Sequence, residues 1–214
     1  MPTTPPLVDI IFLDIDGVLL PFGDHHDILG GGAVPRTYAD GCIFPDATME
    51  ALTTMLMELD ENGNMGTMNG RIVLSSSWRS RPRFVRDILS SFRSYVGSRC
   101  GKGTGKSRAW ESIFGHDFEF FDVTDTEFHS TRHDEVVNWI NSATINGRGK
   151  FTIRSWIALD DEDLVNVEGR IMTDAIRHAV RTISSVGLTL DDVNVAMRLL
   201  ERQVREFHDG SGGG

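Results

Sequence analysis

Cysteine is scarce in this chain of 214 residues, which has only Cys42 and Cys100. Two thiols cannot form a disulfide framework or a thiolate zinc site, and their scarcity favours a reducing, cytoplasmic setting. The sequence also lacks an apolar run of membrane-spanning length, and no basic stretch precedes its first apolar run. We therefore expect a cytoplasmic protein without a membrane partner.

Internal repeats are also absent, and the composition is that of a soluble globular protein, with 40% hydrophobic and 24% charged residues. The length suits one well-packed domain, and a second full domain would be cramped. We expect a single domain over residues 1–209. The glycine-rich end, residues 210–214, is typical of a flexible tail or a remnant of cloning. Nothing in the sequence indicates the oligomeric state.

The charge is unevenly distributed. The net charge of −10 argues against a general nucleic-acid binder. The segment from Arg71 to Arg108, however, contains ten basic residues and one acidic residue, Asp87. Its net charge is therefore +9, and the net charge of the rest of the chain is −19. Two interpretations stay open: the basic segment binds nucleic acid, or it pairs internally with the acidic remainder.

The stretch Leu7–Leu20 predicts a strand that ends at a reactive site. Its apolar run is short and β-branched, as in a buried strand of a parallel sheet. Asp14, Asp16 and Gly17 follow at the strand end, which is where open α/β sheets bind ligands. Two carboxylates beside a glycine turn suit a divalent cation and a nucleophile. The alternative is that the two aspartates only cap a turn.

The remaining pattern alternates strands and helices. Further strands are predicted at 71–74, 118–123, 153–159 and 180–183, and helices at 46–60, 83–93, 132–141 and 190–207. This alternation predicts an α/β fold, a three-layer domain with a mostly parallel sheet.

Polar side chains follow two of these strands. Ser75, with Ser76 in reserve, follows the second strand, where a hydroxyl can donate a hydrogen bond to a phosphoryl oxygen. Asp160 and Asp161 follow the fourth strand, and this second acidic cluster would complete a magnesium site. Serines also cap helices, and Ser77 or Ser80 is a candidate cap for the helix at 83–93.

Two predicted loops contain residues that could suggest a metal site or a phosphate-binding site. Residues 21–45 hold three consecutive glycines and His25 and His26, which we interpret as an irregular loop and not a zinc site. Residues 97–107 end in a string that resembles a phosphate-binding P-loop, but Cys100 stands where the first glycine belongs. We expect a basic flexible loop there, with Lys106 able to contact phosphate.

Four features of the chain occur in the order of the four motifs of haloacid dehalogenase-like (HAD) hydrolases, which the chain resembles. They are Asp14-Ile-Asp16-Gly17, Ser75, a basic residue that begins a helix, and Asp160-Asp161. The resemblance is to the phosphatase branch and covers roughly residues 7–200. It implies a Rossmann-like domain with a small or no cap, limited to residues 21–70. The strings SSSWR, WIALDDED and GLTLDDV are also similar to the HAD domain of bacterial and phage Swiss-army-knife RNA-repair proteins.

The resemblance implies roles for individual residues. Asp14 would attack phosphorus and form an aspartyl-phosphate, and Asp16 would act as general acid and base. Mg²⁺ would be held by Asp14, by the main-chain carbonyl of Asp16 and by Asp160 or Asp161, with Asp163 in support. Arg132 is the best placed cation for the third motif, and Lys150 is the alternative. Contacts to phosphate or substrate are expected from Gly17, Ser76, Arg79, Lys106 and Lys150.

The expected function is thus a Mg²⁺-dependent phosphomonoesterase acting on nucleotide or polynucleotide end phosphates. Phosphatase is favoured over dehalogenase because only an alkoxide leaving group needs the acid Asp16. Two alternatives stay open. One is a small-molecule phosphatase, and the other is a non-catalytic protein of the same fold that binds phosphate or nucleic acid.

Overall fold

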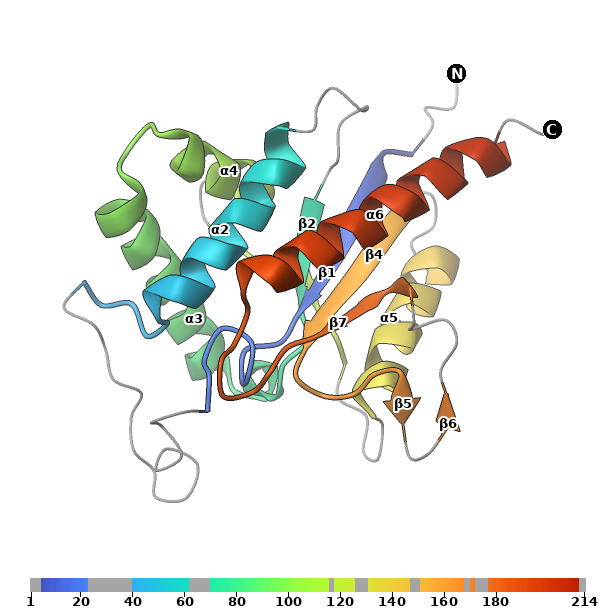
Figure 1. Ribbon diagram of the computed structural model, residues 1–214, viewed down its shortest axis with the longest axis horizontal. Coiled ribbons are helices and arrows are strands. Elements are labelled where there is room, and N and C mark those ends of the chain that lie inside the picture. The colour runs from blue at the N-terminus through green and yellow to red at the C-terminus, as the bar shows by residue number, and fades with distance from the viewer. Residues whose placement is uncertain are drawn as a thin grey trace.

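The computed structural model describes residues 5–22, 40–61, 70–115, 118–125, 131–146, 151–167, 170–171 and 177–211. Its centre is a sheet of five parallel strands in the order β3-β2-β1-β4-β7 (Figure 1). The strands are β1 (Leu7–Leu13), β2 (Gly70–Leu74), β3 (Asp122–Val123), β4 (Thr152–Asp160) and β7 (Ala179–Arg181). The α/β fold with a mostly parallel sheet is therefore confirmed.

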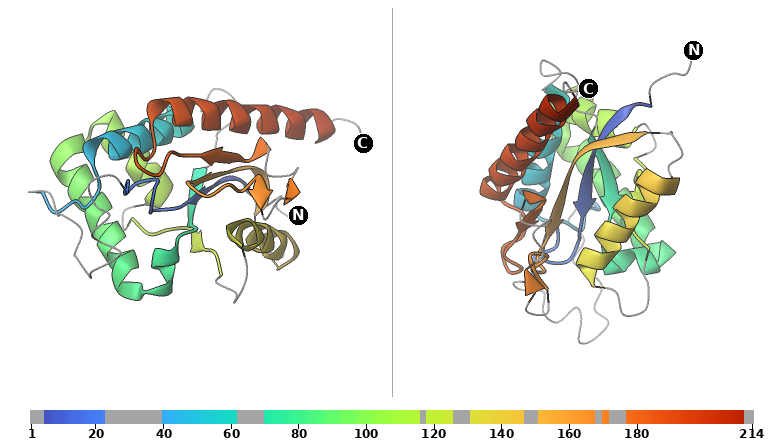
Figure 2. Two further views of the ribbon diagram at one scale, coloured as in Figure 1. Left: turned by 60° about the horizontal axis from the view of Figure 1, so that its bottom comes forward. Right: turned by 90° about the vertical axis from the view of Figure 1, so that its right-hand side faces the viewer.

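Helices cover both faces of the sheet (Figure 2). The helices α2 (Asp46–Glu61), α3 (Pro82–Tyr95), α4 (Gly105–Phe114) and α6 (Leu190–Ser211) contribute to one hydrophobic core, and α5 (Arg132–Asn146) packs on the other side. Two short turns flank α3, a 3₁₀ turn η2 (Ser77–Ser80) and a π turn η3 (Val96–Cys100). Together they form the expected three layers.

Strand β1 divides its side chains between the two cores. Successive residues of a strand point to opposite faces of the sheet. Ile11 and Leu13 join the larger core, and Ile10 and Phe12 join the smaller core beneath α5, where Phe12 meets Trp139 edge to face. Apolar residues are needed on both faces, which explains the nearly continuous apolar run of β1.

Several predicted elements differ in the structure. The apolar run at 118–123 forms ladder pairs only at its end, in β3, because Phe118 has a positive φ of 49° that interrupts an extended strand. The loop predicted at 97–107 is wrong, because the π turn η3 continues α3 and Thr104 caps α4 by accepting from the Ser107 amide. The cap predicted for α3 is also wrong: Pro82 begins the helix, and the preceding Arg81 makes no side-chain cap bond.

The remaining differences lie in the second half of the chain. A short antiparallel pair, β5 (Asn166–Val167) and β6 (Arg170–Ile171), follows β4 and was not predicted. Helix α6 continues through Gly210 and Ser211, where the composition predicts the start of a flexible tail, and residues 212–214 lie outside the described part. None of the helices in the described part of the chain combines the length and apolar character that a membrane crossing requires.

Candidate active site

The carboxyl ends of neighbouring strands bring the candidate residues to one edge of the sheet. The residues just after β1 and β2 continue the hydrogen bonding of the sheet. The Asp14 amide donates to the Leu159 carbonyl of β4 over 3.0 Å, and the Ser75 amide donates to the Leu13 carbonyl of β1 over 2.9 Å. Asp160 is the last residue of β4, beside Asp14. Parallel pairing alone therefore places Ser75, Asp14 and Asp160 side by side.

Three carboxylates meet at this edge. Oxygen atoms of Asp14, Asp160 and Asp161 all lie within 4.8 Å of one another. Asp14 and Asp160 are buried, with 4% and 2% of their surfaces exposed. Burial raises the pKa of Asp14 to about 7, and burial together with the nearby Asp14 charge raises the pKa of Asp160. The two acidic segments that are far apart in sequence thus form one cluster.

The cluster fits a divalent cation. Asp14 Oδ1 is buried and has no hydrogen-bond partner among the described residues. Crowded, desolvated carboxylates resist ionisation unless a positive charge lies between them. Carboxylate oxygens are the ligands that Mg²⁺ prefers. Asp14, Asp160 and Asp161 are therefore suited to hold Mg²⁺.

Gly17 allows the acidic cluster to close. Its φ of +68° lies in the left-handed region, and a Cβ at this position would overlap the Asp161 carboxylate. Its carbonyl accepts a hydrogen bond of 2.8 Å from the Thr182 hydroxyl, which follows β7. The turn after β1 is thus fixed from a strand two positions away in the sheet.

Asp16 lies beside the cluster and is held by an aromatic side chain. The Trp78 indole donates to Asp16 Oδ2 over 2.9 Å. Burial raises the pKa of Asp16, and the hydrogen bond from Trp78 opposes this rise. The half-buried Trp78 ring packs against Phe84 with their centroids 5.0 Å apart. Asp16 therefore keeps its proton to higher pH than an exposed aspartate.

The serines after β2 have three different environments. Ser75 is buried, and its hydroxyl has no hydrogen-bond partner among the residues that the structure describes. Ser76 is buried as well and hydrogen-bonds to Asp14, while exposed Ser77 hydrogen-bonds to Asp16. Ser75 is thus available to a ligand, and the other two serines support the aspartates.

Arg132 begins α5 and points its guanidinium into the carboxylates. Its Nε lies 3.2 Å from Asp160 Oδ2, and its Nη2 lies 3.7 Å from Asp14 Oδ1. Its Nη1 donates to Glu135 Oε2 over 2.9 Å. Burial alone would lower the pKa of Arg132, but the surrounding carboxylates raise it. Arg132 therefore places a positive charge beside Asp14 and Asp160.

A second arginine reaches the same site. Arg79, from η2, pairs through Nη2 with Glu135 Oε2 at 2.6 Å, and only 3% of its side chain is exposed. Its Nε and Nη1 have no hydrogen-bond partner in the described part of the chain. Glu135 thus joins two arginines next to Asp14.

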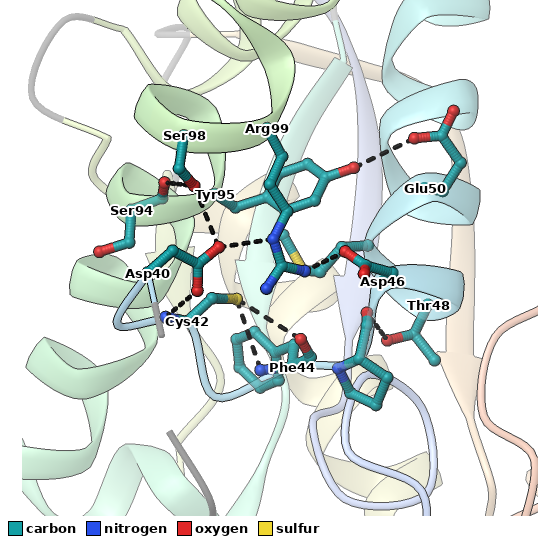
Figure 3. A network of polar contacts seen from close by, with 12 residues as sticks. Asp40, Cys42, Phe44, Asp46, Thr48, Glu50, Ser94, Tyr95, Ser98 and Arg99 are labelled. Atoms are coloured by element: carbon teal, nitrogen blue, oxygen red, sulfur yellow. Dashed lines mark hydrogen bonds and ion pairs between the residues drawn. The ribbon is translucent and has the colours of Figure 1, made fainter. Parts of the chain in front are cut away.

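Three of the ten basic residues of the segment form ion pairs with acids outside it in the described part of the chain, and one of these is Arg79. Arg99 binds Asp40, with Nε to Oδ2 at 2.5 Å, and also binds Asp46 at the start of α2 (Figure 3). Lys106 pairs with Glu50 of α2. These contacts place Lys106 between α4 and α2, and they favour internal pairing for this end of the segment.

Some candidates from the sequence lie outside the described residues, namely Lys150, His25 and His26. Other members of the site were not predicted, and three of these are Glu135, Trp78 and Thr182. Each acts through a side-chain contact between elements far apart in sequence, as in Trp78 to Asp16. The sequence indicated these residues only through their position close to a predicted motif residue. Glu135, for example, lies one helical turn after Arg132.

Comparisons with known proteins agree with this geometry. A search of the curated proteins and a search of the solved structures each found no match. A family model described as the HAD domain in Swiss Army Knife RNA repair proteins matches residues 10–193, which include every strand end described above. The chain therefore belongs to the family of HAD domains found in Swiss Army Knife RNA repair proteins.

Proposed function

We propose that the protein is a Mg²⁺-dependent phosphomonoesterase that works through an aspartyl-phosphate on Asp14. One observation carries this proposal. Asp14 is a buried carboxylate whose Oδ1 has no hydrogen-bond partner among the described residues, and it lies among acids suited to a cation and beside two arginines. Membership of the HAD domain family supports hydrolase chemistry. An arginine beside the nucleophile can supply positive charge for the oxygens of a phosphate ester.

The residues divide the work of two displacements. In the first, Asp14 forms a bond to phosphorus while the leaving oxygen departs with the P–O electron pair and takes the proton of Asp16. In the second, Asp16 accepts a proton from water as its oxygen attacks phosphorus, which releases phosphate and frees Asp14. Asp16 is suited to both steps because burial raises its pKa and Trp78 fixes its orientation.

The metal would be held by Asp14, Asp160 and Asp161. When bound, Mg²⁺ neutralises the repulsion between an anionic carboxylate and an anionic phosphate. The Ser75 hydroxyl is free to donate to a phosphoryl oxygen. Gly17 provides the close approach that lets Asp161 join the other acids.

The leaving group is proposed to be a nucleoside at a nucleotide or polynucleotide end. Asp16 protonates the leaving oxygen, so the leaving group lies on its side of the site. The half-buried rings of Trp78 and Phe84 lie there, and the guanidinium of exposed Arg81 lies over the Phe84 ring, 5.2 Å from its centroid. Aromatic rings with nearby arginines are the usual contacts of single-stranded bases and their phosphates.

The substrate test compares 3′- and 5′-phosphorylated oligonucleotides with a small phosphate ester at several salt concentrations. We expect a higher kcat/KM for an oligonucleotide, falling steeply with salt. The variant Phe84→Leu, which leaves the hydrogen bond between Trp78 and Asp16 in place, is expected to reduce only the oligonucleotide rate. Equal, salt-insensitive rates would support the small-molecule alternative.

The non-catalytic alternative is tested with Asp14→Asn. We expect Mg²⁺-dependent hydrolysis of a chromogenic phosphate ester by the wild-type protein and a loss of at least about a thousandfold in the variant, because the nucleophile is gone. Identical rates in the two proteins would mean contamination and a protein that only binds.

A further inference from the structure

The two arginines beside Asp14 use their N–H groups differently. Each side-chain nitrogen of Arg132 lies within ion-pair distance of a carboxylate oxygen: Nε is 3.2 Å from Asp160, Nη1 is 2.9 Å from Glu135 and Nη2 is 3.7 Å from Asp14. Only the Nη1 contact is a hydrogen bond, and Nε has no hydrogen-bond partner among the described residues. The charge of Arg132 is therefore engaged in holding three acids together. A ligand that took these N–H groups would have to displace carboxylates.

Arg79 has fewer carboxylate neighbours, because among the described residues only one of its nitrogens forms an ion pair. One nitrogen, Nη2, pairs with Glu135, and the other two nitrogens have no hydrogen-bond partner within the described residues. The side chain is only 3% exposed, so water has little access to these donors. Leaving buried charged donors without partners costs free energy, and a position that retains them is prepared for an anion.

The position of Arg79 relates these donors to the reaction. Asp14 is among the charges that act on the Arg79 guanidinium. Arg79 follows Ser75 by four residues, so both come from the segment after β2. Ser75 also has a buried, unpartnered donor. One short segment thus presents three unpartnered donor groups near the nucleophile.

We propose that Arg79, and not Arg132, donates the hydrogen bonds that hold the phosphoryl oxygens, and that Glu135 is the positioning residue that fixes Arg79. Arg132 then keeps the carboxylates of Asp14 and Asp160 together. This assignment rests on the proposed function and differs from the resemblance, which gives phosphate binding to the cation that opens α5. The ligand is a phosphate ester or inorganic phosphate.

The test measures binding of inorganic phosphate by calorimetry at saturating MgCl₂, which requires no turnover. We expect Arg79→Gln to weaken binding by about 10-fold to 100-fold, the effect of losing charged hydrogen bonds. Arg132→Gln is expected to weaken it about tenfold less. Arg83→Gln is the matched control, because it removes the same charge from an exposed side chain outside the site. Equal losses in the Arg79 and Arg132 variants, or no loss in the first, would overturn the assignment.

Two further variants separate hydrogen bonding from folding. Arg79→Lys keeps the charge opposite Glu135 and is expected to show an intermediate loss, whereas wild-type affinity would refute the role of the guanidinium donors. Glu135→Gln is expected to raise KM for a phosphate ester about tenfold while kcat changes little. A fall in melting temperature and kcat with unchanged phosphate affinity would assign Glu135 a purely structural role.

The outcomes also distinguish this assignment from the proposed function. If the wild-type protein binds phosphate through Arg79 but hydrolyses no ester, the phosphatase proposal fails and the assignment of Arg79 stands. If the wild-type protein does not bind phosphate in the presence of Mg²⁺, the assignment is overturned.

Discussion

Replacing Asp14 by asparagine is expected to stabilise the metal-free protein at high pH. Burial raises the pKa of Asp14 from 3.8 to about 7, and the ionised form is therefore disfavoured in the folded state. A pKa difference of about three units corresponds to roughly 4 kcal/mol of unfolding free energy at 1.36 kcal/mol per unit. The asparagine variant cannot ionise and avoids this penalty.

The sign follows from proton binding. Between about pH 4 and pH 7 the folded state holds a proton at Asp14 that the unfolded state has released, so wild-type stability falls as pH rises through this range. Below this range Asp14 is protonated in both states, and above it the full penalty is present. The advantage of Asp14→Asn therefore grows from near zero at pH 4 to its maximum near pH 8.

The assay is thermal and urea unfolding at pH 4, 6 and 8 in the presence of a chelator. For a chain of this size, 4 kcal/mol corresponds to a shift in melting temperature of roughly 8–16 °C. Glu119→Gln removes an exposed carboxylate away from the site and is expected to show no comparable gain. If Asp14→Asn is no more stable than wild type at pH 8, the free-energy cost that we infer for burying an ionised Asp14 is refuted.

The remaining predictions concern the metal, the turn after β1 and the general acid. Adding Mg²⁺ is expected to raise the melting temperature of the wild-type protein at pH 8 and to raise that of Asp14→Asn much less; equal shifts would count against Asp14 as a ligand. Gly17→Ala is expected to weaken activation by Mg²⁺ at least about tenfold, because of its positive φ and its overlap with Asp161. Gly97→Ala, which has no neighbouring atom within 4 Å, is the matched control, and equal activation constants would contradict the argument. Trp78→Phe keeps an aromatic ring but removes the N–H donor that lowers the pKa of Asp16. In this variant kcat/KM is expected to fall about tenfold, and the ionisation of Asp16 in the pH profile is expected to move to higher pH. An unchanged pH profile would exclude this role for the indole.

The sequence predicted the strand ends better than the loops between them. The apolar run before Asp14 identifies β1, because a strand buried on both faces needs apolar residues at nearly every position, and the one exception, Asp9, is paired with Arg154. The same logic applies to β2 before Ser75 and β4 before Asp160. Once these strands are parallel neighbours, their terminal side chains meet without further information, and the cluster of Asp14, Asp160 and Asp161 confirms that expectation.

Side-chain pairing was harder to predict. Glu135 reads as an ordinary helix residue next to Arg132, and only the structure brings it within 2.6 Å of Arg79. We predicted a loop over residues 97–107 because glycines at 101, 103 and 105 are typical of loops. In the structure the π turn η3 continues α3, and Thr104 caps the next helix. Such contacts depend on the packing of distant segments, which local propensity does not report.

The central claim is that Asp14 becomes phosphorylated, and trapping the acyl phosphate tests it most directly. The protein would be mixed with a phosphate ester and Mg²⁺, quenched in acid within one turnover, reduced with borohydride and digested for mass spectrometry. Reduction converts an aspartyl-phosphate to homoserine, and we predict this change at position 14 alone, dependent on both substrate and Mg²⁺. Turnover without any modified peptide, or modification at Asp160 instead, would contradict the account.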